Sequence, residues 1–397
     1  MDLFKKCYDF KLADQYKEMG IYPYFHSLES KQDIVVEMEG KREIMIGSNN
    51  YLGLTGNEEV IEASIEATEQ FGTGCSGSRF LNGTTTAHLE LEKELAEFMQ
   101  REDCITMSTG FQTNLGIISA IAGRGDVVLC DKENHASIYD AIKLSYADMI
   151  RYRHNDMVDL EDKLKHVPEG KGILIVTDGV FSMSGEICKL PEIVELKKKY
   201  GARLLVDDAH SFGILGENGR GTGEYFGLED EVDLVFGTFS KSLASIGGFC
   251  VGDHKVIDYI RHNSRPFIFS ASITPASVAA TRKALEIIKR EPERREHLLQ
   301  ISDYMRNALK QRGIKIKEAT TPIIPIYTYE PDLTLTACKL LFDGGVYVSP
   351  VLPPATPPGE CLIRTSYTAT HTEELMDEAA DIIKDVLTEL NIIGEDK

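Results

Sequence analysis

The sequence predicts an α/β protein with a large domain, built on a mostly parallel sheet flanked by helices, and a smaller α+β C-terminal domain. From Gly56 to about Arg290, apolar runs suited to buried strands alternate with helical stretches. This alternation is typical of parallel sheets with helices on both faces. Small and polar residues follow the strand runs, at the edge where such sheets bind ligands. After Pro275, long helical stretches and short strands indicate the second domain.

Composition narrows the class of protein. The 397 residues carry a formal net charge of −20, so the surface repels nucleic acid and we expect no nucleic-acid partner. The eight cysteines are scattered without a CxxC pair, which argues against disulfides or a zinc site and favours a cytoplasmic location. The N-terminus lacks a signal-peptide core, and no apolar run approaches the roughly 20 residues of a transmembrane segment. We therefore expect no metal and no membrane span.

Residues 1–55 are expected to form an N-terminal arm followed by short strands. Residues 1–30 have the pattern of an amphipathic helical arm with clustered aromatic residues. Such an arm packs on a partner, covers a cleft, or simply frays as termini often do. Strands are predicted around Asp33–Met38 and Lys41–Ile46, with the turn at Glu39-Gly40.

The large domain is predicted over residues 56–290. Periodicity predicts helices at Glu58–Gln70, Ala87–Gln100, Asn114–Ala122, Ser137–Ser145 and Pro191–Tyr200. Apolar runs predict strands at Cys104–Met107, Val127–Cys130, Ile173–Thr177, Leu204–Val206 and Val232–Phe236. Because the carboxyl ends of parallel strands meet at one edge, we expect the residues that follow these five strands to lie close together.

The small domain is predicted over residues 291–397. The helical pattern at Ala276–Arg290 continues into Arg294–Arg312. Beyond it, the predicted elements are a strand at Ile323–Tyr327, a helix at Leu335–Phe342, short strands around Val346–Val348 and Cys361–Thr365, and a helix at Thr372–Leu390.

Lys241 follows a predicted buried strand in the stretch DLVFGTFSKSLASIGG, residues 233–248. Partial burial lowers the pKa of a lysine, whose free amine then condenses with a carbonyl group. A solvated surface charge is the ordinary state of a lone lysine. The neighbouring small residues and the other strand ends are what favour a chemical role.

The segment LLVDDAH delivers Asp207 and His210 from another predicted strand. A buried carboxylate needs a cationic partner, and a protonated pyridine nitrogen would serve. The alternatives are a helix cap, or a metal bound together with His210. A metal would need more ligands than this hydroxyl-rich neighbourhood offers.

Backbone N–H groups at Ser108-Thr109-Gly110-Phe111, where a strand gives way to a helix, can hold a phosphate with help from the helix dipole. Thr238 and Ser240 can add hydroxyl donors. An ordinary N-cap is the alternative interpretation. His135 in DKENHAS can stack on an aromatic cofactor ring, although a single loop histidine is more often structural.

Arg364 in ECLIRTSYTATHT has the guanidinium geometry that matches a substrate carboxylate, the alternative being a surface salt bridge. Asn50 in GSNNYLGL can reach the same ligand. The glycine-rich segment Gly72–Thr84 is either a wall of the site or an irregular loop. An imine-forming lysine, a carboxylate for a ring nitrogen, a stacking histidine, phosphate-binding hydroxyls and a carboxylate-binding arginine together indicate pyridoxal 5'-phosphate chemistry on an amino acid.

The chain resembles the α-oxoamine synthases, which are fold-type I pyridoxal-phosphate transferases. The resemblance covers nearly the whole chain and rests on motifs in the family's order: NNYLGL (49–54), the glycine-rich segment ending in NGT, NHAS (134–137), GVFSM (179–183), VDDAHSFG (206–213), GTFSKSL (237–243) and SYTATHT (366–372). Within the family, GSNNYLGLT, GSRFLNGT and LPPATPPGE (352–360) are most similar to the soluble bacterial serine palmitoyltransferases.

The resemblance implies roles for residues at matching positions. Lys241 would form the imine with the cofactor and act as acid and base at the α-carbon, and Asp207 would pair with the pyridine nitrogen. His210 would contact the phenolic oxygen, and His135 would stack on the ring and contact the serine carboxylate. The implied cofactor-binding set also includes Gly110, Phe111, Thr238, Ser240, Ser182 and Ser272, and the implied substrate-binding set is Arg364, Asn50 and His135.

The family also implies an obligate homodimer with active sites at the interface. The FSASITP segment (269–275) would approach the partner's phosphate through Ser270 or Ser272. Two residues depart from the family pattern: Asp178 stands where glutamate is frequent, and Ala271 where threonine is frequent. A direct role for Asp178 and the contact across the interface are therefore in doubt.

The implied reaction is the decarboxylative condensation of L-serine with a long-chain acyl-CoA such as palmitoyl-CoA, giving 3-ketodihydrosphingosine, CoA and CO₂, the first step of sphingolipid biosynthesis. The alternatives are condensation of alanine with pimeloyl-CoA or of glycine with acetyl-CoA, and, from another class, a non-catalytic partner subunit. Intact Lys241 and Asp207 argue against the last. Peripheral contact of the arm with a membrane stays open, because the product is a lipid.

Overall fold

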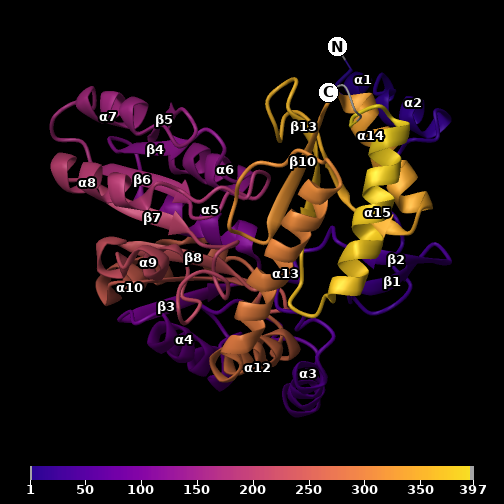
Figure 1. Cartoon of the computed structure of the whole chain (residues 1–397). Helices are drawn as coiled ribbons and strands as arrows, with labels where there is room; N and C mark the ends of the chain where they lie inside the picture. The colour runs from indigo at the N-terminus through magenta and orange to yellow at the C-terminus, as the bar shows by residue number, and fades with distance from the viewer. Residues whose placement is uncertain (1, 394–397) are drawn as a thin grey trace. The chain divides into compact units, whose positions relative to one another are not determined.

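A seven-stranded sheet is the centre of the larger of two units in the computed structural model, which describes residues 2–393 (Figure 1). The strand order is β3-β9-β8-β7-β6-β4-β5. The strands are β3 (Asp103–Met107), β4 (Val127–Asp131), β5 (Asp148–Tyr152), β6 (Ile173–Asp178), β7 (Arg203–Asp207), β8 (Leu234–Thr238) and β9 (Gly248–Gly252). Strands β4 to β8 pair in parallel, whereas β9 is antiparallel to both of its neighbours. The predicted mostly parallel sheet is confirmed.

Helices cover this sheet because its strands are apolar on both faces. Every residue of β4 and β8 is buried, as expected of strands that have helices above and below. The helices of the unit are α3 (Glu58–Phe71), α4 (Thr86–Phe98), α5 (Gly110–Ile121), α6 (Ala136–Ser145), α7 (Met157–Lys165), α8 (Leu190–Tyr200), α9 (Thr222–Phe226), α10 (His254–Asn263), α11 (Arg265–Ile268) and α12 (Pro275–Arg290). One core cluster joins apolar side chains of α5, α6 and α10 to the strands.

The five predicted strands and five predicted helices of this region are all present, with ends that differ by a few residues. Six elements were not predicted: β5, β9, α7, α9, α10 and α11. β5 is half-exposed at the edge of the sheet and has no apolar run. β9 begins and ends with glycine, a residue that ordinarily weakens a strand signal.

The smaller unit contains two three-stranded sheets. One has the order β1-β2-β11 and the other β10-β13-β12. The strands are β1 (Val35–Met38), β2 (Lys41–Met45), β10 (Ile323–Tyr329), β11 (Val346–Tyr347), β12 (Ser349–Val351) and β13 (Cys361–Ser366). The predicted turn between β1 and β2 is confirmed: Glu39 and Gly40 have φ values of 50° and 71°, as a tight two-residue hairpin requires. The helices are α13 (Pro292–Gln311), which begins in the larger unit, α14 (Pro331–Asp343) and α15 (Glu373–Glu389).

The smaller unit is discontinuous in sequence. Contacts group residues up to Asn49, Met183–Gly185 and residues from His297 onward into one unit, and Asn50–Ser182 with Glu186–Glu296 into the other. From the sequence we expect residues 1–55 to form a separate arm with short strands. The structure joins the strands to the C-terminal part, because β2 pairs in parallel with β11.

The N-terminal arm is helical and contains two short helices, α1 (Lys5–Tyr8) and α2 (Leu12–Glu18). Neither helix has a buried residue, and Leu3, Tyr8 and Phe10 are 74%, 69% and 60% exposed. These three side chains are therefore largely exposed among the described residues.

Three further findings concern the described residues. None of their helices has the length and apolar character that crossing a membrane requires. No group of three or more His, Cys, Asp or Glu side chains among residues 2–393 is arranged to hold a metal ion. All eight cysteines are free thiols, and six of them are buried.

Candidate active site at the carboxyl ends of the strands

Residues from five strand ends gather at the carboxyl edge of the large sheet. β7 ends at Asp207, β6 ends at Asp178, and Lys241 follows β8. His135 follows β4, and Gly110 opens α5 directly after β3. The Lys241 ammonium charge lowers the pKa of Asp207, His135 and Asp178, so these side chains share one electrostatic environment. Burial is the largest influence on the pKa of each of the three.

Asp207 is a buried carboxylate whose charge is only partly compensated. It is 4% exposed, and its oxygens accept hydrogen bonds from Asn114 Nδ2 at 2.8 Å and the Ala209 N–H at 3.0 Å. Burial raises the pKa of Asp207, although Lys241 and the hydrogen bond from Asn114 oppose the increase. A cationic ligand group beside Asp207 would relieve this desolvation.

A hydrogen-bond chain links Asp207 to His135. The Asn114 amide donates one hydrogen to Asp207 and the other to Ser137 Oγ at 2.9 Å. Ser137 Oγ lies 2.7 Å from His135 Nδ1, which also accepts from the Ser137 N–H. Since the serine oxygen accepts from Asn114, its hydroxyl hydrogen points to Nδ1, and a neutral His135 carries its proton on Nε2. Sequence reasoning did not find Asn114 or Ser137 as site residues. The only signal was that Ser137 ends the NHAS motif.

His135 and Phe111 lie together at the solvent-accessible side of the site. Their rings meet edge to face, with centroids 6.4 Å apart, and both side chains are exposed. Protein atoms around the imidazole desolvate it. This effect and the charge of Lys241 lower the pKa of His135, while Asp207 acts in the opposite direction. A neutral imidazole face is therefore available at neutral pH.

The N-terminus of α5 approaches the end of β8 closely. A Cβ atom on Gly110 would lie 2.7 Å from Oγ1 of Thr238, so only glycine permits this approach. Thr238 Oγ1 lies 3.0 Å from Oγ of Ser240, and Ser240 is exposed. Helix N–H groups and two hydroxyls thus line one small region, which suits a phosphate group.

His210 is held by a residue that sequence reasoning missed. Its Nδ1 forms a 2.7 Å hydrogen bond with the hydroxyl of Tyr51, which is fully buried. Tyr51 lies within the NNYLGL motif, but its ring could not be assigned a partner from sequence. Asp178, beside Asp207 in strand register, accepts a 3.3 Å hydrogen bond from the His135 N–H. Burial and the charge of Asp207 raise the pKa of Asp178, so this carboxyl is protonated more readily than usual.

The FSASITP segment contacts the glycine-rich segment of the same chain. Ser272 donates through both its N–H and its hydroxyl to the carbonyl of Gly77, and Gln112 donates to Ser270 Oγ at 2.9 Å. Ser182 lies in the turn between β6 and α8. The structure thus places Ser272 against Gly77 and assigns Ser270 a partner near the start of α5.

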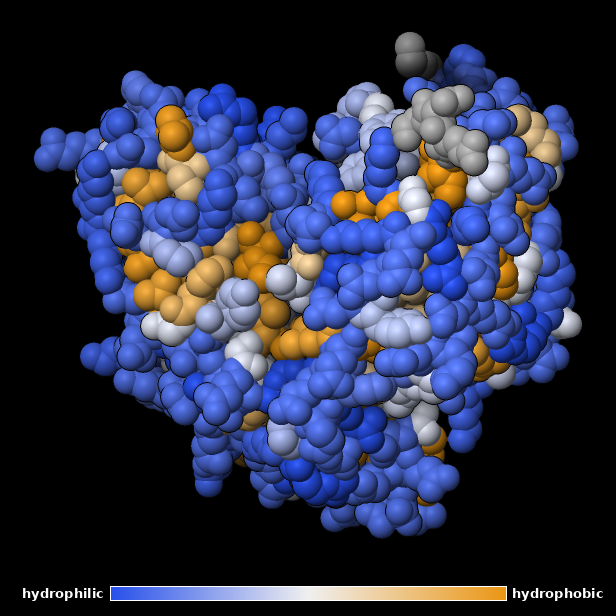
Figure 2. Space-filling model, viewed as in Figure 1, coloured by the Kyte–Doolittle hydropathy of each residue, from blue (hydrophilic) through white to orange (hydrophobic). Residues whose placement is uncertain are grey.

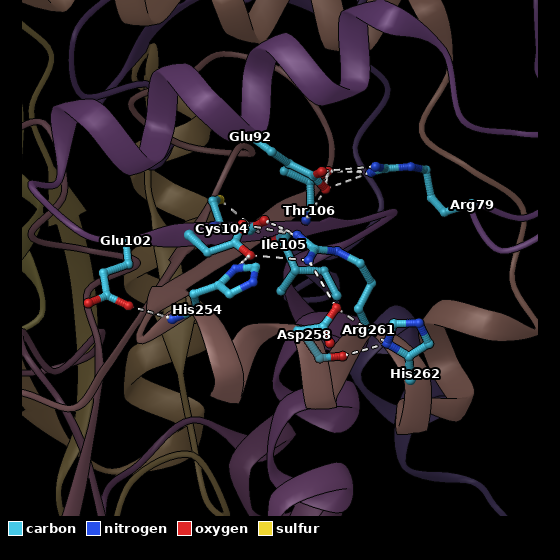
Figure 3. Close-up of polar contacts among 11 residues, drawn as sticks. Arg79, Glu92, Glu102, Cys104, Ile105, Thr106, His254, Asp258, Arg261 and His262 are labelled. Carbon is cyan, nitrogen blue, oxygen red and sulfur yellow. Dashed lines mark hydrogen bonds and ion pairs between the residues drawn. The ribbon is translucent and has the colours of Figure 1, made fainter.

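The glycine-rich segment is anchored and is not simply an irregular loop. Arg79 makes a bidentate ion pair with Glu92, whose carboxylate also accepts from the N–H and hydroxyl of Thr106 (Figure 3). The Arg79 and Glu92 side chains are both 6% exposed. A buried ion pair with this many hydrogen bonds fixes the segment relative to β3, since removing one partner would leave a buried charge unpaired.

Arg364 and Asn50 belong to different units. Arg364 lies on β13 in the smaller unit, where it is 6% exposed and donates to Asn49 Oδ1 at 2.9 Å. Asn50 lies in the larger unit, and its Oδ1 accepts from the N–H and hydroxyl of Thr55. Asn49 of this motif therefore contacts Arg364.

A hollow lies at the opposite edge of the sheet, near the amino ends of β6, β7 and β8. It encloses about 750 Å³, and Figure 2 shows apolar surface in the region where Figure 1 labels β7, β8 and α10. Its lining includes Ile121, Ile173, Leu204 and Val256. None of the predicted site residues lines it, so its size alone does not make it the active site.

The strand-end site fits pyridoxal phosphate. A buried carboxylate that needs a cation suits the pyridine nitrogen, and the glycine-dependent approach at Gly110 leaves helix N–H groups and hydroxyls for the phosphate. Lys241 supplies the amine for the carbonyl. The fold and this site define a fold-type I pyridoxal-phosphate enzyme.

Comparison with known proteins gives the family. The model of the family "Aminotransferase class I and II" matches residues 41–383. A serine palmitoyltransferase of Sphingobacterium spiritivorum is 51% identical over 372 residues, which cover 94% of this chain and 93% of that protein. An 8-amino-7-oxononanoate synthase of Bacillus velezensis is 42% identical over 380 residues, or 96% and 97% of the two chains.

Solved structures of serine palmitoyltransferases are also similar to this chain. A serine palmitoyltransferase from S. paucimobilis with bound PLP-myriocin aldimine matches with a TM-score of 0.96 and 37% identity, over 99% of this chain and 100% of that one. The chain belongs to the aminotransferase class I and II family, as a pyridoxal-phosphate enzyme of the α-oxoamine synthase kind.

Proposed function

We propose that this chain is an acyltransferase that condenses L-serine with a long-chain acyl-CoA, with loss of CO₂ and CoA, to give 3-ketodihydrosphingosine. One observation carries the proposal: the lysine, carboxylate and imidazole at the strand ends occur in a chain that matches serine palmitoyltransferases along nearly its whole length. The 8-amino-7-oxononanoate synthase match has lower identity, so condensation of alanine with pimeloyl-CoA is the second candidate.

Pyridoxal phosphate, when bound, supplies the electron sink that reactions at the α-carbon of an amino acid need. The Lys241 amine would hold the cofactor through its carbonyl and would move the proton at the α-carbon. The Asp207 carboxylate keeps the pyridine nitrogen protonated, and its burial strengthens that charge interaction. His135 would lie against the cofactor ring and bind the serine carboxylate, and His210 would bind the phenolic oxygen.

The phosphate is held at the start of α5. The N–H groups of Gly110 and Phe111 and the hydroxyls of Thr238 and Ser240 bind it, as the close approach of α5 to β8 supports. We include Ser182 in the cofactor-binding set, and Ser272 as a contact to the partner's cofactor. The hydroxyl of Ser272 donates a hydrogen bond to the carbonyl of Gly77 in its own chain, which supports a role in shaping the FSASITP segment.

Arg364 is proposed to bind the carboxylate of serine. Arg364→Ala should raise the KM for serine about 10- to 100-fold and leave the KM for palmitoyl-CoA nearly unchanged, because a charge-assisted bidentate bond is lost only with the amino acid. Steady-state kinetics with each substrate varied in turn measures the two constants. Arg42→Ala is the control, because Arg42 is an exposed arginine paired with Glu378 in the same unit. Equal changes in both KM values would contradict a carboxylate-binding role.

The substrate assignment is tested by CoA release from the purified protein. Serine, alanine and glycine are each combined with acetyl-, pimeloyl- and palmitoyl-CoA. We expect turnover with serine and palmitoyl-CoA at least about 100-fold above every other combination, since a site with hydrogen bonds to a substrate hydroxyl discriminates strongly against analogues that lack it. Turnover with alanine and pimeloyl-CoA instead would be consistent with the proposed roles of the catalytic residues but would contradict the proposed substrates.

We further propose a cytoplasmic homodimer with active sites at the interface. Large apolar side chains within the FSASITP and glycine-rich segments support a covered surface here: Phe269 and Leu81 are each 77% exposed. Eight free thiols suit a reducing compartment. Peripheral contact of the arm with lipid is supported by its exposed apolar residues.

A further inference from the structure

His154 lies outside the predicted site but touches two segments beside it. It follows β5 and its side chain is 17% exposed. Its Nδ1 lies 3.0 Å from Oδ1 of Asp131, and its Nε2 lies 3.1 Å from Oε2 of Glu186 and 3.6 Å from Oε2 of Glu133. The ring meets that of Phe181 edge to face, with centroids 4.3 Å apart.

The geometry requires a protonated ring. Each ring nitrogen faces a carboxylate oxygen, and a carboxylate accepts but does not donate, so both nitrogens must carry hydrogen. Burial lowers the pKa of His154, but the hydrogen bonds with Asp131 and Glu186 outweigh it and raise the pKa to about 10. The charge of Glu133 acts in the same direction.

One partner of His154 shapes the turn that carries His135. Asp131 ends β4, and its carboxylate accepts the N–H of Glu133 at 2.8 Å and of Asn155 at 2.8 Å. Its carbonyl accepts the N–H of Asn134 at 3.2 Å. The position of His135, the next residue, therefore depends on the orientation of a carboxylate that His154 holds.

The other partner belongs to the hairpin that carries Ser182. Val180 and Ile187 form a bridge at its base, and the Phe181 N–H donates to the carbonyl of Glu186 at 2.9 Å. His154 contacts both Phe181 and Glu186. Asn155, next along the chain, donates through its amide to the Ile187 carbonyl at 3.2 Å.

We propose that the imidazolium of His154 is a positioning residue that holds the Asp131–His135 turn and the Val180–Ile187 hairpin in one register. Resting on the proposed function, this places the ring of His135 and the hydroxyl of Ser182 together against the cofactor. His154 itself touches neither substrate nor cofactor. Because His154 orders the two turns before ligands bind, less conformational entropy is lost on binding.

The test is the affinity of the apoenzyme for pyridoxal phosphate, measured by absorbance titration. His154→Gln should raise the dissociation constant about tenfold and raise the KM for serine with a smaller change in kcat, since a misplaced contact weakens ligand binding. His166→Gln is the matched control, a histidine of the same unit whose side chain is 76% exposed. It should change neither constant.

Glu186→Gln provides a second, milder variant, because the Glu186 side chain is 40% exposed and the substitution keeps its shape. We expect a dissociation constant about threefold higher than that of the wild type. If both variants fold and bind cofactor and serine like the wild type, the proposal is wrong, even if their melting temperatures fall. The titration uses no acyl-CoA or amino acid. Its outcome is therefore independent of the CoA-release assay that tests the combinations of amino acid and acyl-CoA.

Melting temperature against pH gives an independent readout. The pKa of His154 is raised in the folded state, so its stabilising effect is full below about pH 6.5, the ordinary histidine value, and is lost as pH rises toward 10. The difference in melting temperature between wild type and His154→Gln should therefore be larger at pH 6 than at pH 10. A difference that is the same at both pH values would contradict a charged His154.

Discussion

Lys241→Ala is expected to lower turnover of serine and palmitoyl-CoA by at least about 1,000-fold and to remove the visible absorbance band of lysine-bound cofactor. The substitution removes both the amine that binds the cofactor carbonyl and the group that moves the α-proton. General acid–base catalysis alone contributes about 10²- to 10⁴-fold. Absorbance spectra and CoA release, measured on the same preparation, check the two effects separately.

Lys255→Ala is the control for this loss. Lys255 is an exposed lysine of α10 in the same unit, so its removal should alter neither the spectrum nor turnover. The pKa values of Asp207 and His135 should also change in Lys241→Ala, because the Lys241 charge acts on both groups. Retained turnover in a correctly folded Lys241→Ala protein would exclude Lys241 as the cofactor-binding lysine.

Asp207→Asn is expected to weaken cofactor binding and to lower turnover by about 100- to 1,000-fold, the range found when one preorganised electrostatic contact is lost. The amide keeps the size of the side chain but cannot hold a proton on the pyridine nitrogen. In the apoenzyme, the same change should leave the melting temperature unchanged or raise it. The reason is that Asp207 is buried and burial disfavours its charged form.

Asp208→Asn separates this effect from a general loss of structure. Asp208 is equally buried, but it accepts hydrogen bonds from the hydroxyls of Ser211 and Thr222 and holds a neighbouring turn. We expect it to lower the melting temperature while leaving turnover per folded molecule unchanged. If Asp207→Asn behaved in the same way, with normal turnover per folded molecule, the role of Asp207 would be structural.

Sequence reasoning located the strand-end residues because their signals are local. A buried strand such as β8 is an unbroken apolar run, and the residue after it falls at the functional edge whatever the rest of the chain does. Lys241, Asp207 and His135 were therefore placed at one edge of the sheet by pattern alone. Their individual roles came from the family resemblance and not from the pattern.

The connecting residues could not be predicted for a physical reason. Asn114 and Ser137 lie inside helices, where a polar residue leaves no periodic signal of its partner. The contact between Tyr51 and His210 joins residues 159 positions apart. The hydrogen bond from Arg364 to Asn49 joins residues 315 positions apart, so it too leaves no local signal in the sequence.

The discontinuity of the smaller unit has a consequence for biosynthesis. Lys41 donates to Asp343, 302 residues later, and β2 gains its neighbour β11 only when that part of the chain has been made. The larger unit ends at Glu296. It can therefore fold before the smaller unit is complete, since domains generally fold as units during translation. The β1-β2 hairpin must wait through most of synthesis with one edge unpaired, which is a site of off-pathway association. Recovery of native protein will therefore depend more on chaperone supply and growth temperature than the stability of the finished fold would suggest.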